Sequence, residues 1–201
     1  MKRLLSLGLL GALATLMVSC SSSSNLAQKQ HQLFSQRTDY RKNHEVYRNE
    51  EVLAKANSSN TSVRIDLSDQ RAQLLVTDGV QNLVAMDLPC CTGKAGKRTP
   101  AGVFAIKEKI VTKRSTIFGS LYRNGRKVYR GDRRKYRGRY DRYVGSALPY
   151  WMRLTNGGVG MHYSAYVHRY PGSNGCIRMP KPAVQTIFSK TKVGTPVHIV
   201  H

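Results

Sequence analysis

The stretch "VRIDLSDQRAQLLVTDGVQNLVAMDLPC", residues 63–90, predicts a series of short β-strands. Its first five residues alternate apolar and polar side chains, which is the two-residue period of a half-buried strand. "SDQ" supplies a turn, and the Asp78-Gly79 pair between two apolar runs is a strong β-hairpin signal. We therefore expect this stretch to open a folded, strand-rich domain.

The rest of the domain continues this pattern and adds one helix. "AGVFAIKEK" and "TPVHIV" predict further strands, and "GGVGMHY" predicts a glycine-rich strand or strand end. "KPAVQTIFSK" predicts a short helix, because Val184, Ile187 and Phe188 share one helical face and Pro182 lies near its start. Many short strands with one or two short helices predict a β-rich sandwich or mixed-sheet domain over residues 62–201.

The chain is strongly basic, with a formal net charge of +22. Such a chain is expected to meet an anionic partner, which is nucleic acid, a lipid surface or an acidic polymer. The positive charge is densest in residues 121–143, which hold ten Lys or Arg, two Asp and five Tyr. Three interpretations of this segment stay open: a site for single-stranded nucleic acid, a solvated loop or hairpin, and a lid that binds an anionic polymer and offers tyrosine faces to its sugars.

The N-terminus indicates export. Residues 1–19 begin with two cations and an apolar run that is too short to span a membrane comfortably, as in a secretory signal peptide. The end of the run resembles a bacterial lipobox, which implies that Cys20 is lipidated and becomes the new N-terminus. An ordinary signal peptide cut nearby is the alternative. Lipid would anchor the protein to a membrane, and Ser21 favours the outer membrane by resemblance to Gram-negative lipoproteins.

These features predict the surroundings of the domain. We expect a periplasmic, lipid-anchored protein that does not meet nucleic acid, because exported proteins do not normally do so. Residues 20–61 are expected to be a lipidated N-terminus and flexible tether, since "SSSSNLAQKQ" is polar and of low complexity and "ANSSNTS" is rich in turn formers. A helix between these two stretches would have only a weak apolar face.

The cysteines favour a reactive thiol. If Cys20 carries lipid, three thiols remain: Cys90, Cys91 and Cys176. Adjacent cysteines rarely bond to each other because the geometry strains the peptide between them, and no spacing suggests a zinc site. An odd thiol in an exported protein indicates reactivity. Cys176 is the candidate, since it follows a glycine and precedes a cation in "SNGCIRMP" instead of lying among apolar neighbours.

A cysteine nucleophile needs a base. A free thiol with a pKa of about 8.5 is largely protonated at neutral pH, so attack requires a histidine in space. His162 and His168 are nearest in the sequence, and His162 is favoured because it ends the strand-like "GGVGMH". Gly175 permits close backbone approach before Cys176, and the amides of these two residues are candidates to bind an oxyanion.

The segment "GVGMHYSAYVHRYPGSNGCIRMP" resembles the catalytic segment of the L,D-transpeptidases, the YkuD-type peptidoglycan enzymes. That family has a histidine at a strand end, a loop, and then Ser/Thr-His-Gly-Cys followed by an apolar residue and often Arg. The stretches "IDLSDQRAQLLV", "CTGKAGKRTPAGVFAI", "LPYWMRLTNGGVGMH" and "VGTPVHIV" are similar to other parts of the family's domain. The resemblance extends over residues 62–201 and implies an L,D-transpeptidase-like β-sandwich or mixed sheet.

The resemblance implies a role for each matched position. Cys176 would be the nucleophile, and His162 would be its base and later the general acid. The backbone carbonyl of Tyr163 would orient the imidazole, and the backbone amide of Gly175 would lie near the oxyanion. The substrate-binding residues implied are Ser173, Asn174, Arg178 and Tyr150. No metal and no organic cofactor is implied.

The family's reaction is acyl transfer on peptidoglycan stem peptides. The resemblance implies that the thiolate attacks the carbonyl of the diamino acid at the third position, expels the terminal D-Ala and forms a thioester. An amine from a second stem then makes a 3-3 cross-link. Water as the acceptor gives an L,D-carboxypeptidase, and a protein lysine gives anchoring of that protein to the wall. The alternative from another class is a non-catalytic peptidoglycan-binding lipoprotein.

Three positions depart from the family pattern. Asn174 stands where a second histidine is most common, Ser164 replaces a usual glycine after the base, and Cys91 stands where many relatives have Ser. We expect Asn174 to alter substrate contacts and Ser164 to narrow the donor channel. Cys91 is expected to be a small buried residue; the alternative is that it lines the pocket and pairs with Cys176 on oxidation.

Overall fold

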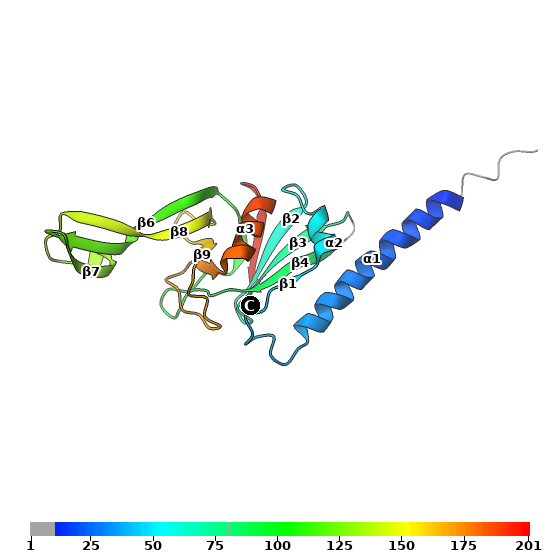
Figure 1. Ribbon diagram of the computed structural model, residues 1–201, viewed down its shortest axis with the longest axis horizontal. Helices are drawn as coiled ribbons and strands as arrows, with labels where there is room; N and C mark the ends of the chain where they lie inside the picture. Colours follow the sequence, from blue (N-terminus) through cyan, green and yellow to red (C-terminus); the bar gives the residue numbers. More distant parts are fainter. Residues whose placement is uncertain (1–10, 80) are drawn as a thin grey trace, which may run out of the picture.

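Two β-sheets around a shared apolar core form the body of the molecule (Figure 1). The structure, a computed structural model, describes residues 11–79 and 81–201, with side chains from residue 23 onward. The first sheet has six strands, in the spatial order β1 (Tyr47–Arg48), β4 (Asn82–Pro89), β3 (Arg71–Thr77), β2 (Thr61–Asp66), β11 (Pro196–Val200) and β5 (Gly102–Ala105). The second has five, in the order β10 (Ile177–Met179), β9 (Gly160–Tyr163), β8 (Arg142–Arg153), β6 (Glu108–Arg123) and β7 (Arg126–Asp132).

The first sheet forms where the alternating pattern predicts strands. β2, β3 and β4 pair antiparallel in succession, and Gly79 adopts a φ of 93° in the turn between β3 and β4. Val63 and Ile65 are fully buried while Arg64 between them is partly exposed. The C-terminal strand β11 pairs parallel with β2 and antiparallel with β5, which completes the sheet. The predicted β-rich fold is confirmed.

The second sheet and one helix carry the segments expected to hold the site. β10 pairs parallel with β9, and β8 pairs antiparallel with both β9 and β6. The helix α3 (Lys181–Lys190) follows β10 after a single proline and packs against β8 and β9. Its buried residues, Ala183, Val184 and Ile187, join the core between the sheets. The predicted helix over residues 181–190 is confirmed.

The basic segment 121–143 forms the outer part of an arm that projects from the second sheet (Figure 1). The long strands β6 and β8 pair with each other, and β7 returns alongside β6. Asn124 and Gly125 connect β6 to β7 with φ values of 49° and 77°, the positive values that a type I′ hairpin turn requires. A short 3-10 helix, η1 (Arg133–Lys135), leads from β7 toward β8. The segment is therefore a strand-built arm.

The N-terminal segment packs against the first sheet, which corrects the flexible tether expected over residues 20–61. The helix α1 (Gly11–Ser35) contacts β4, and so do β1 and the short helix α2 (Glu50–Lys55). The side chains buried there are Phe34, Tyr40, Val52 and Leu53. On α1 the covered positions Ser24, Ala27, His31 and Phe34 keep a helical spacing, but two of the four are polar, so the sequence alone did not mark an apolar face there.

The predicted signal peptide and lipid site fall largely outside what the structure describes. Residues 1–10 and the side chain of Cys20 lie outside the described residues. In the described part of the chain, no helix is long and apolar enough to cross a membrane. The signal peptide, the lipid on Cys20 and the outer-membrane location stay predictions.

A buried ion pair holds the N-terminal segment to the sheet. Asp87 and Arg71 are both fully buried and lie 2.7 Å apart. The hydroxyl of Tyr40 donates to the Asp87 carboxylate at 2.8 Å, and Nε2 of His31 lies 2.8 Å from the same oxygen. Burial alone would raise the pKa of Asp87, but the hydrogen bond with His31 and the charge of Arg71 hold it below its ordinary value. One carboxylate thus joins the segment before β1 to strands β3 and β4.

Candidate active site

The parallel pair of β9 and β10 brings the predicted catalytic residues to one cavity. In their register Arg178 pairs with His162, so both side chains leave the same face of the sheet. Cys176 lies just before β10 and two positions before Arg178, on the same face by strand alternation. All three residues line a cavity of about 630 Å³ whose walls include the base of the arm. Cys176 and His162 therefore share one site.

The backbone orients the imidazole of His162. Its Nδ1 lies 2.7 Å from the carbonyl oxygen of Tyr163. A carbonyl can only accept, so Nδ1 carries the proton and Nε2 keeps its lone pair for the cavity. Burial, followed by the positive charge of Arg178, lowers the pKa of His162 to about 4, although the hydrogen bond to Tyr163 acts in the opposite direction. The imidazole is thus neutral at neutral pH, with the indole of Trp151 6.2 Å away between ring centres.

The thiol of Cys176 is half-buried at the cavity wall. Its Sγ lies 3.6 Å from the carbonyl oxygen of Gly158, and the backbone amide of Gly160 donates to the sulfur. Burial raises the pKa of the Cys176 thiol, and the hydrogen bond from Gly160 and the charge of Arg178 oppose that rise without cancelling it. The pair consequently consists of a neutral thiol and a neutral imidazole at neutral pH.

The loop before Cys176 is held by its own hydrogen bonds. Ser173 Oγ donates to the carbonyl oxygen of Cys176 at 2.6 Å and accepts from the amide of Gly175 at 3.0 Å. Gly175 has a φ of 115°, which a side chain would strain, so glycine is required at this turn. Because the Gly175 amide already donates to Ser173, the expectation that it binds the oxyanion is corrected. Ser173 itself is buried and acts on the loop.

The other predicted substrate-binding residues divide into two groups. Asn174, Arg178 and Ser164 line the cavity with Cys176. Tyr150 does not: its ring packs on Phe188 of α3 at 5.7 Å, and its hydroxyl accepts a hydrogen bond from Gln185 at 2.6 Å. The predicted place of Tyr150 in the substrate site is corrected. Its neighbours Pro149 and Trp151 both line the cavity, so strand alternation places Tyr150 on the opposite face of β8, toward α3.

Two further residues support the site and were not singled out from the sequence. Thr99 is buried; its hydroxyl donates to the Gly175 carbonyl at 2.8 Å and accepts from the Gly93 amide at 2.9 Å. Glu108 accepts from Trp151 Nε1 at 2.9 Å and thereby holds the ring beside His162. Thr99 lies in the "KRTPAG" stretch, whose resemblance to the family was its only signal.

The remaining thiols and the second histidine lie apart from the cavity lining. Cys90 and Cys91 are fully buried and form no disulfide, and Cys91 Sγ lies 3.5 Å from the carbonyl oxygen of Tyr170. Cys91 is thus a small buried residue, as expected, and it does not line the cavity of Cys176. His168 stacks on Tyr170 with ring centres 4.9 Å apart. Among the described residues, no three or more His, Cys, Asp or Glu side chains gather as metal ligands would.

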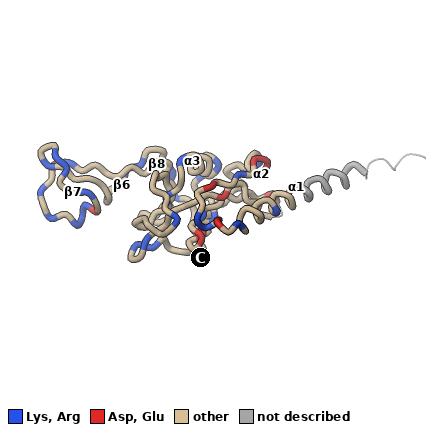
Figure 2. The backbone as a smooth tube through the Cα atoms, turned by 60° about the horizontal axis from the view of Figure 1, so that its bottom comes forward, with Lys and Arg blue, Asp and Glu red and all other residues tan. Residues whose placement is uncertain are grey.

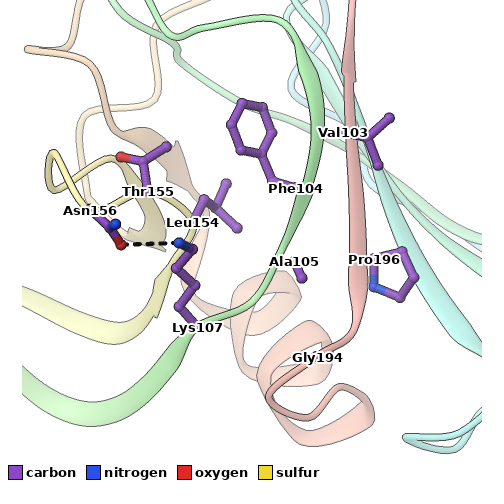
Figure 3. A pocket seen from close by; sticks show the side chains of 9 residues that line it. All are labelled: Val103, Phe104, Ala105, Lys107, Leu154, Thr155, Asn156, Gly194 and Pro196. Atoms are coloured by element: carbon purple, nitrogen blue, oxygen red, sulfur yellow. Dashed lines mark hydrogen bonds between the residues drawn. The ribbon is translucent and has the colours of Figure 1, made fainter.

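A second cavity, of about 580 Å³, lies beside the edge strand β5 (Figure 3). Apolar side chains such as Val103, Phe104 and Leu154 line much of it, and Lys107 Nζ donates to Asn156 at 3.0 Å on one side. Its lining includes no cysteine, histidine or carboxylate among the described residues. The candidate nucleophile and base line the cavity of Cys176 instead.

Two mixed sheets with a cysteine and a backbone-oriented histidine on neighbouring parallel strands are the arrangement of an L,D-transpeptidase fold. A family model described as the YkuD L,D-transpeptidase catalytic domain matches residues 60–199, and the chain belongs to this family. No curated protein matches the chain.

Solved structures show the same fold. An L,D-transpeptidase from Stackebrandtia nassauensis is 23% identical with a TM-score of 0.50, and the match covers 73% of this chain and 58% of that one. An L,D-transpeptidase from Mycobacterium smegmatis is 19% identical with a TM-score of 0.52, over 70% of this chain and 58% of that one. The chain thus spans less than two thirds of the length of these structures.

Proposed function

We propose that the chain is a cysteine-dependent L,D-transpeptidase that acts on peptidoglycan stem peptides through a thioester at Cys176. The observation that carries the proposal is that Cys176 and His162 line one cavity while Nδ1 of His162 is held 2.7 Å from the Tyr163 carbonyl. A nucleophile, a base and a group that orients the base are the three parts that nucleophilic acyl transfer requires. Membership of the YkuD family supports the same assignment.

The first half-reaction begins with proton transfer. As the sulfur of Cys176 approaches the carbonyl carbon of the donor stem, Nε2 of His162 takes the thiol proton and the carbon–sulfur bond forms. The carbonyl oxygen becomes an oxyanion, for which the backbone amide of Cys176 is the candidate donor, since the Gly175 amide is engaged with Ser173. Collapse breaks the bond to the terminal D-Ala. The imidazolium of His162 protonates the departing amine, which leaves a thioester on Cys176 and a neutral histidine.

Resolution of the thioester reverses the roles. An amine of a second stem loses a proton to His162 as it attacks the thioester carbonyl, and the thiol of Cys176 is regenerated. The product of this step is a 3-3 cross-link. Water at the same position gives an L,D-carboxypeptidase, and a protein lysine gives an anchored protein. The low pKa of His162, about 4, supports this cycle because the base form is present at neutral pH at the start of each half-reaction.

The cations of the cavity support an anionic donor. Arg178 is on the same face as Cys176 and makes no ion pair among the described residues, which suits a carboxylate of the stem peptide. Asn174 is exposed at the cavity wall beside it, where its amide can hydrogen-bond the peptide backbone of the donor. These two residues are the proposed donor contacts.

The decisive experiment is muropeptide analysis by mass spectrometry after purified wall is incubated with the full chain. Wild type should produce 3-3 cross-linked dimers and release D-Ala, and Cys176→Ala should produce neither. Shortened stems without dimers would instead identify the carboxypeptidase reaction. Binding to the wall with unchanged muropeptides in wild type would contradict the enzyme and favour the non-catalytic lipoprotein. Matched thermal melting of the two proteins controls for folding.

The location of the protein is a separate proposal. The "MVSC" ending of the apolar run supports lipid on Cys20, and Ser21 supports the outer membrane. Metabolic labelling with a fatty acid in a Gram-negative host should mark the wild type and leave Cys20→Ala unlabelled. Equal labelling of both would contradict a lipid at Cys20.

A further inference from the structure

The charged side chains that line the cavity of Cys176 are all basic among the described residues. Six basic residues contribute to its wall, and among the described residues no Asp or Glu does: the six are Lys113, Arg114, Lys127, Arg130, Arg153 and Arg178. Glu108 partly neutralises two of them, Lys113 and Arg153, at 3.4 Å each. The other four make no ion pair with a described residue, so the cavity carries a net positive field toward its solvent side.

The pairing of β6 with β7 places two of these cations, Lys127 and Arg130, on the face of the arm that lines the cavity. In the pairing of β6 with β7, Ser120 lies opposite Arg130 and Tyr122 lies opposite Lys127. Opposite residues of an antiparallel pair project from the same face, and Ser120, Lys127 and Arg130 all line the cavity. We call this surface the cavity face of the arm and define it by Phe118, Ser120, Lys127, Arg130 and Val144. It is continuous with the wall that holds Cys176.

The arm does not neutralise itself. Residues 121–143 hold ten Lys or Arg and only two Asp. Asp132 pairs with Arg134 at 2.7 Å, and Asp141 accepts from the backbone amide of Asn124 at 2.6 Å. Lys127 and Arg130 are exposed and have no acidic partner among the described residues. Lys and Arg gather along the arm in Figure 2, at the end of the molecule opposite α1 in Figure 1.

The tyrosines of the arm disfavour single-stranded nucleic acid as its partner. Base stacking requires open aromatic faces. Tyr129 and Tyr136 stack on each other with ring centres 5.3 Å apart, and the guanidinium of Arg142 lies 4.3 Å above the ring of Tyr122. Arg133 covers Tyr143 in the same way at 5.0 Å. Four of the five tyrosines of the arm thus hold its own strands and cations, and Tyr140 alone among them is exposed, at 44%. One open ring does not form the row of stacking faces that single-stranded nucleic acid requires.

We propose that the cavity face of the arm binds a carboxylate-bearing glycan–peptide chain whose reacting stem occupies the cavity of Cys176. Lys127 and Arg130 contact carboxylates on the parts of that polymer that extend along the arm beyond the reacting stem, and Arg114 continues the contact at the base of the arm. A hollow, elongated and cationic surface fits a chain better than it fits a flat membrane. The inference rests on the proposed function for the identity of the reacting stem, and the arm supplies affinity for the polymer around it.

The test compares two charge-matched double variants in the full chain with Cys176→Ala, which prevents turnover. Lys127→Gln/Arg130→Gln removes the two cations of the cavity face. Arg137→Gln/Arg139→Gln removes two exposed cations of the same arm that do not line the cavity. Binding is measured by co-sedimentation with purified peptidoglycan sacculi over a series of salt concentrations. We expect the first variant to lose roughly fivefold in affinity at low salt and to bind with a weaker salt dependence. We expect the second to lose less than roughly twofold.

Three results would overturn the proposal. Equal losses of affinity in both variants would show that the arm acts only through its overall positive charge. No loss of affinity in either variant would show that the arm does not bind the polymer. Displacement of the protein from sacculi by oligodeoxythymidine or by phosphatidylglycerol vesicles, at a lower charge concentration than soluble wall fragments require, would identify another partner. A separate measurement tests the proposed function. A carbapenem is a β-lactam that a nucleophilic thiol opens to give a covalent acyl adduct, and no such adduct on Cys176 of wild type, by intact mass, would contradict the proposed function. The sacculus measurement does not depend on that adduct.

Discussion

Nδ1 of His162 lies 2.7 Å from the carbonyl oxygen of Tyr163, the residue that follows it on the same strand. The group that orients the base is therefore a backbone carbonyl, which strand β9 places without any carboxylate. This relationship sets the tautomer of the imidazole and leaves Nε2 to take a proton. Burial and the positive charge of Arg178 lower the pKa of His162, and the hydrogen bond to the Tyr163 carbonyl opposes that shift without cancelling it.

Removal of the base should slow acylation strongly. We expect His162→Ala to reduce the rate of carbapenem acylation at Cys176 by about 10²- to 10⁴-fold at neutral pH, because the thiol is then left without a proton acceptor. Intact-mass kinetics measure this rate. His198→Ala, at an exposed position of β11, is the matched control and should react like wild type. A rate for His162→Ala within a factor of about three of wild type would contradict the role of His162 as base.

The acylation rate should fall only at unusually acidic pH. His162 loses its function when it is protonated, and its pKa is about 4, so the rate should hold from neutral pH downward and fall only as pH approaches that value. The raised pKa of Cys176 keeps the thiol protonated over the same range, so no thiolate limb appears there. Stopped-flow or mass-spectrometric acylation at a series of pH values tests this. A limb centred near the ordinary histidine value of about 6.5 would show that the imidazole is not buried as described.

Thr99 should position the nucleophile loop. Thr99→Val keeps the shape of the side chain but leaves the Gly175 carbonyl and the Gly93 amide without their partner. We expect a loss of about 1–3 kcal/mol in the free energy of unfolding, together with slower acylation, because the loop that presents Cys176 loosens. Urea unfolding and carbapenem acylation measure the two effects. Thr112→Val, at an exposed position of β6, should change neither.

Tyr150 should be dispensable for chemistry. Tyr150→Phe removes the hydroxyl that accepts from Gln185 and retains the ring that packs on Phe188. The acylation rate should stay within a factor of about two of wild type, and the free energy of unfolding should fall by less than about 1 kcal/mol, because the lost hydrogen bond is exposed. A larger drop in acylation would return Tyr150 to the substrate site.

Asp87 should control the docking of the N-terminal segment. Asp87→Asn leaves the fully buried guanidinium of Arg71 without its counter-charge, and breaking such a pair is expected to cost about 3–5 kcal/mol in the free energy of unfolding. Asn keeps only one acceptor oxygen, so it cannot accept from Arg71 and from Tyr40 and His31 as the two carboxylate oxygens do, and the segment before β1 should become sensitive to limited proteolysis. Urea unfolding and proteolysis with mass mapping read both effects. Glu51→Gln, exposed on α2, is the control. Equal changes in unfolding free energy and in proteolysis for the two variants would show that the ion pair does not hold the N-terminal segment.

The strands of the first sheet were predictable because a strand that is buried on one face alternates apolar and polar residues along the sequence. "VRIDL" alternates, Asp78-Gly79 permits the hairpin, and Val63 and Ile65 are indeed buried in β2. The helix over residues 181–190 was predictable in the same way, from its apolar face and its early proline. The pairing of Cys176 with His162 was accessible for another reason: it rested on resemblance to a family motif in which the two residues lie close in the sequence.

The arm and the N-terminal segment show where local information ends. Basic and aromatic residues in 121–143 were compatible with a loop, a hairpin or a lid, and pairing with β8 selects the strand-built arm. The covered face of α1 includes the polar Ser24 and His31 beside Ala27 and Phe34, so its packing on β4 was not visible as an apolar stripe in the sequence. Charge and composition could predict an anionic partner, whereas the register of β6 and β7 decides which cations face the cavity.

By itself, the sequence determined the β-rich class, the position of helix α3 and the choice of Cys176 and His162 as the candidate thiol and imidazole, because each depends on neighbouring residues or on a short motif. Only the tertiary structure decided that the Gly175 amide is engaged with Ser173, that Tyr150 faces α3, and that Thr99 supports the loop before Cys176. The first depends on the direction of one hydrogen bond within a loop, and the other two depend on contacts between residues far apart in the sequence. Such directions are set when the whole chain packs, and no local pattern of residues encodes them.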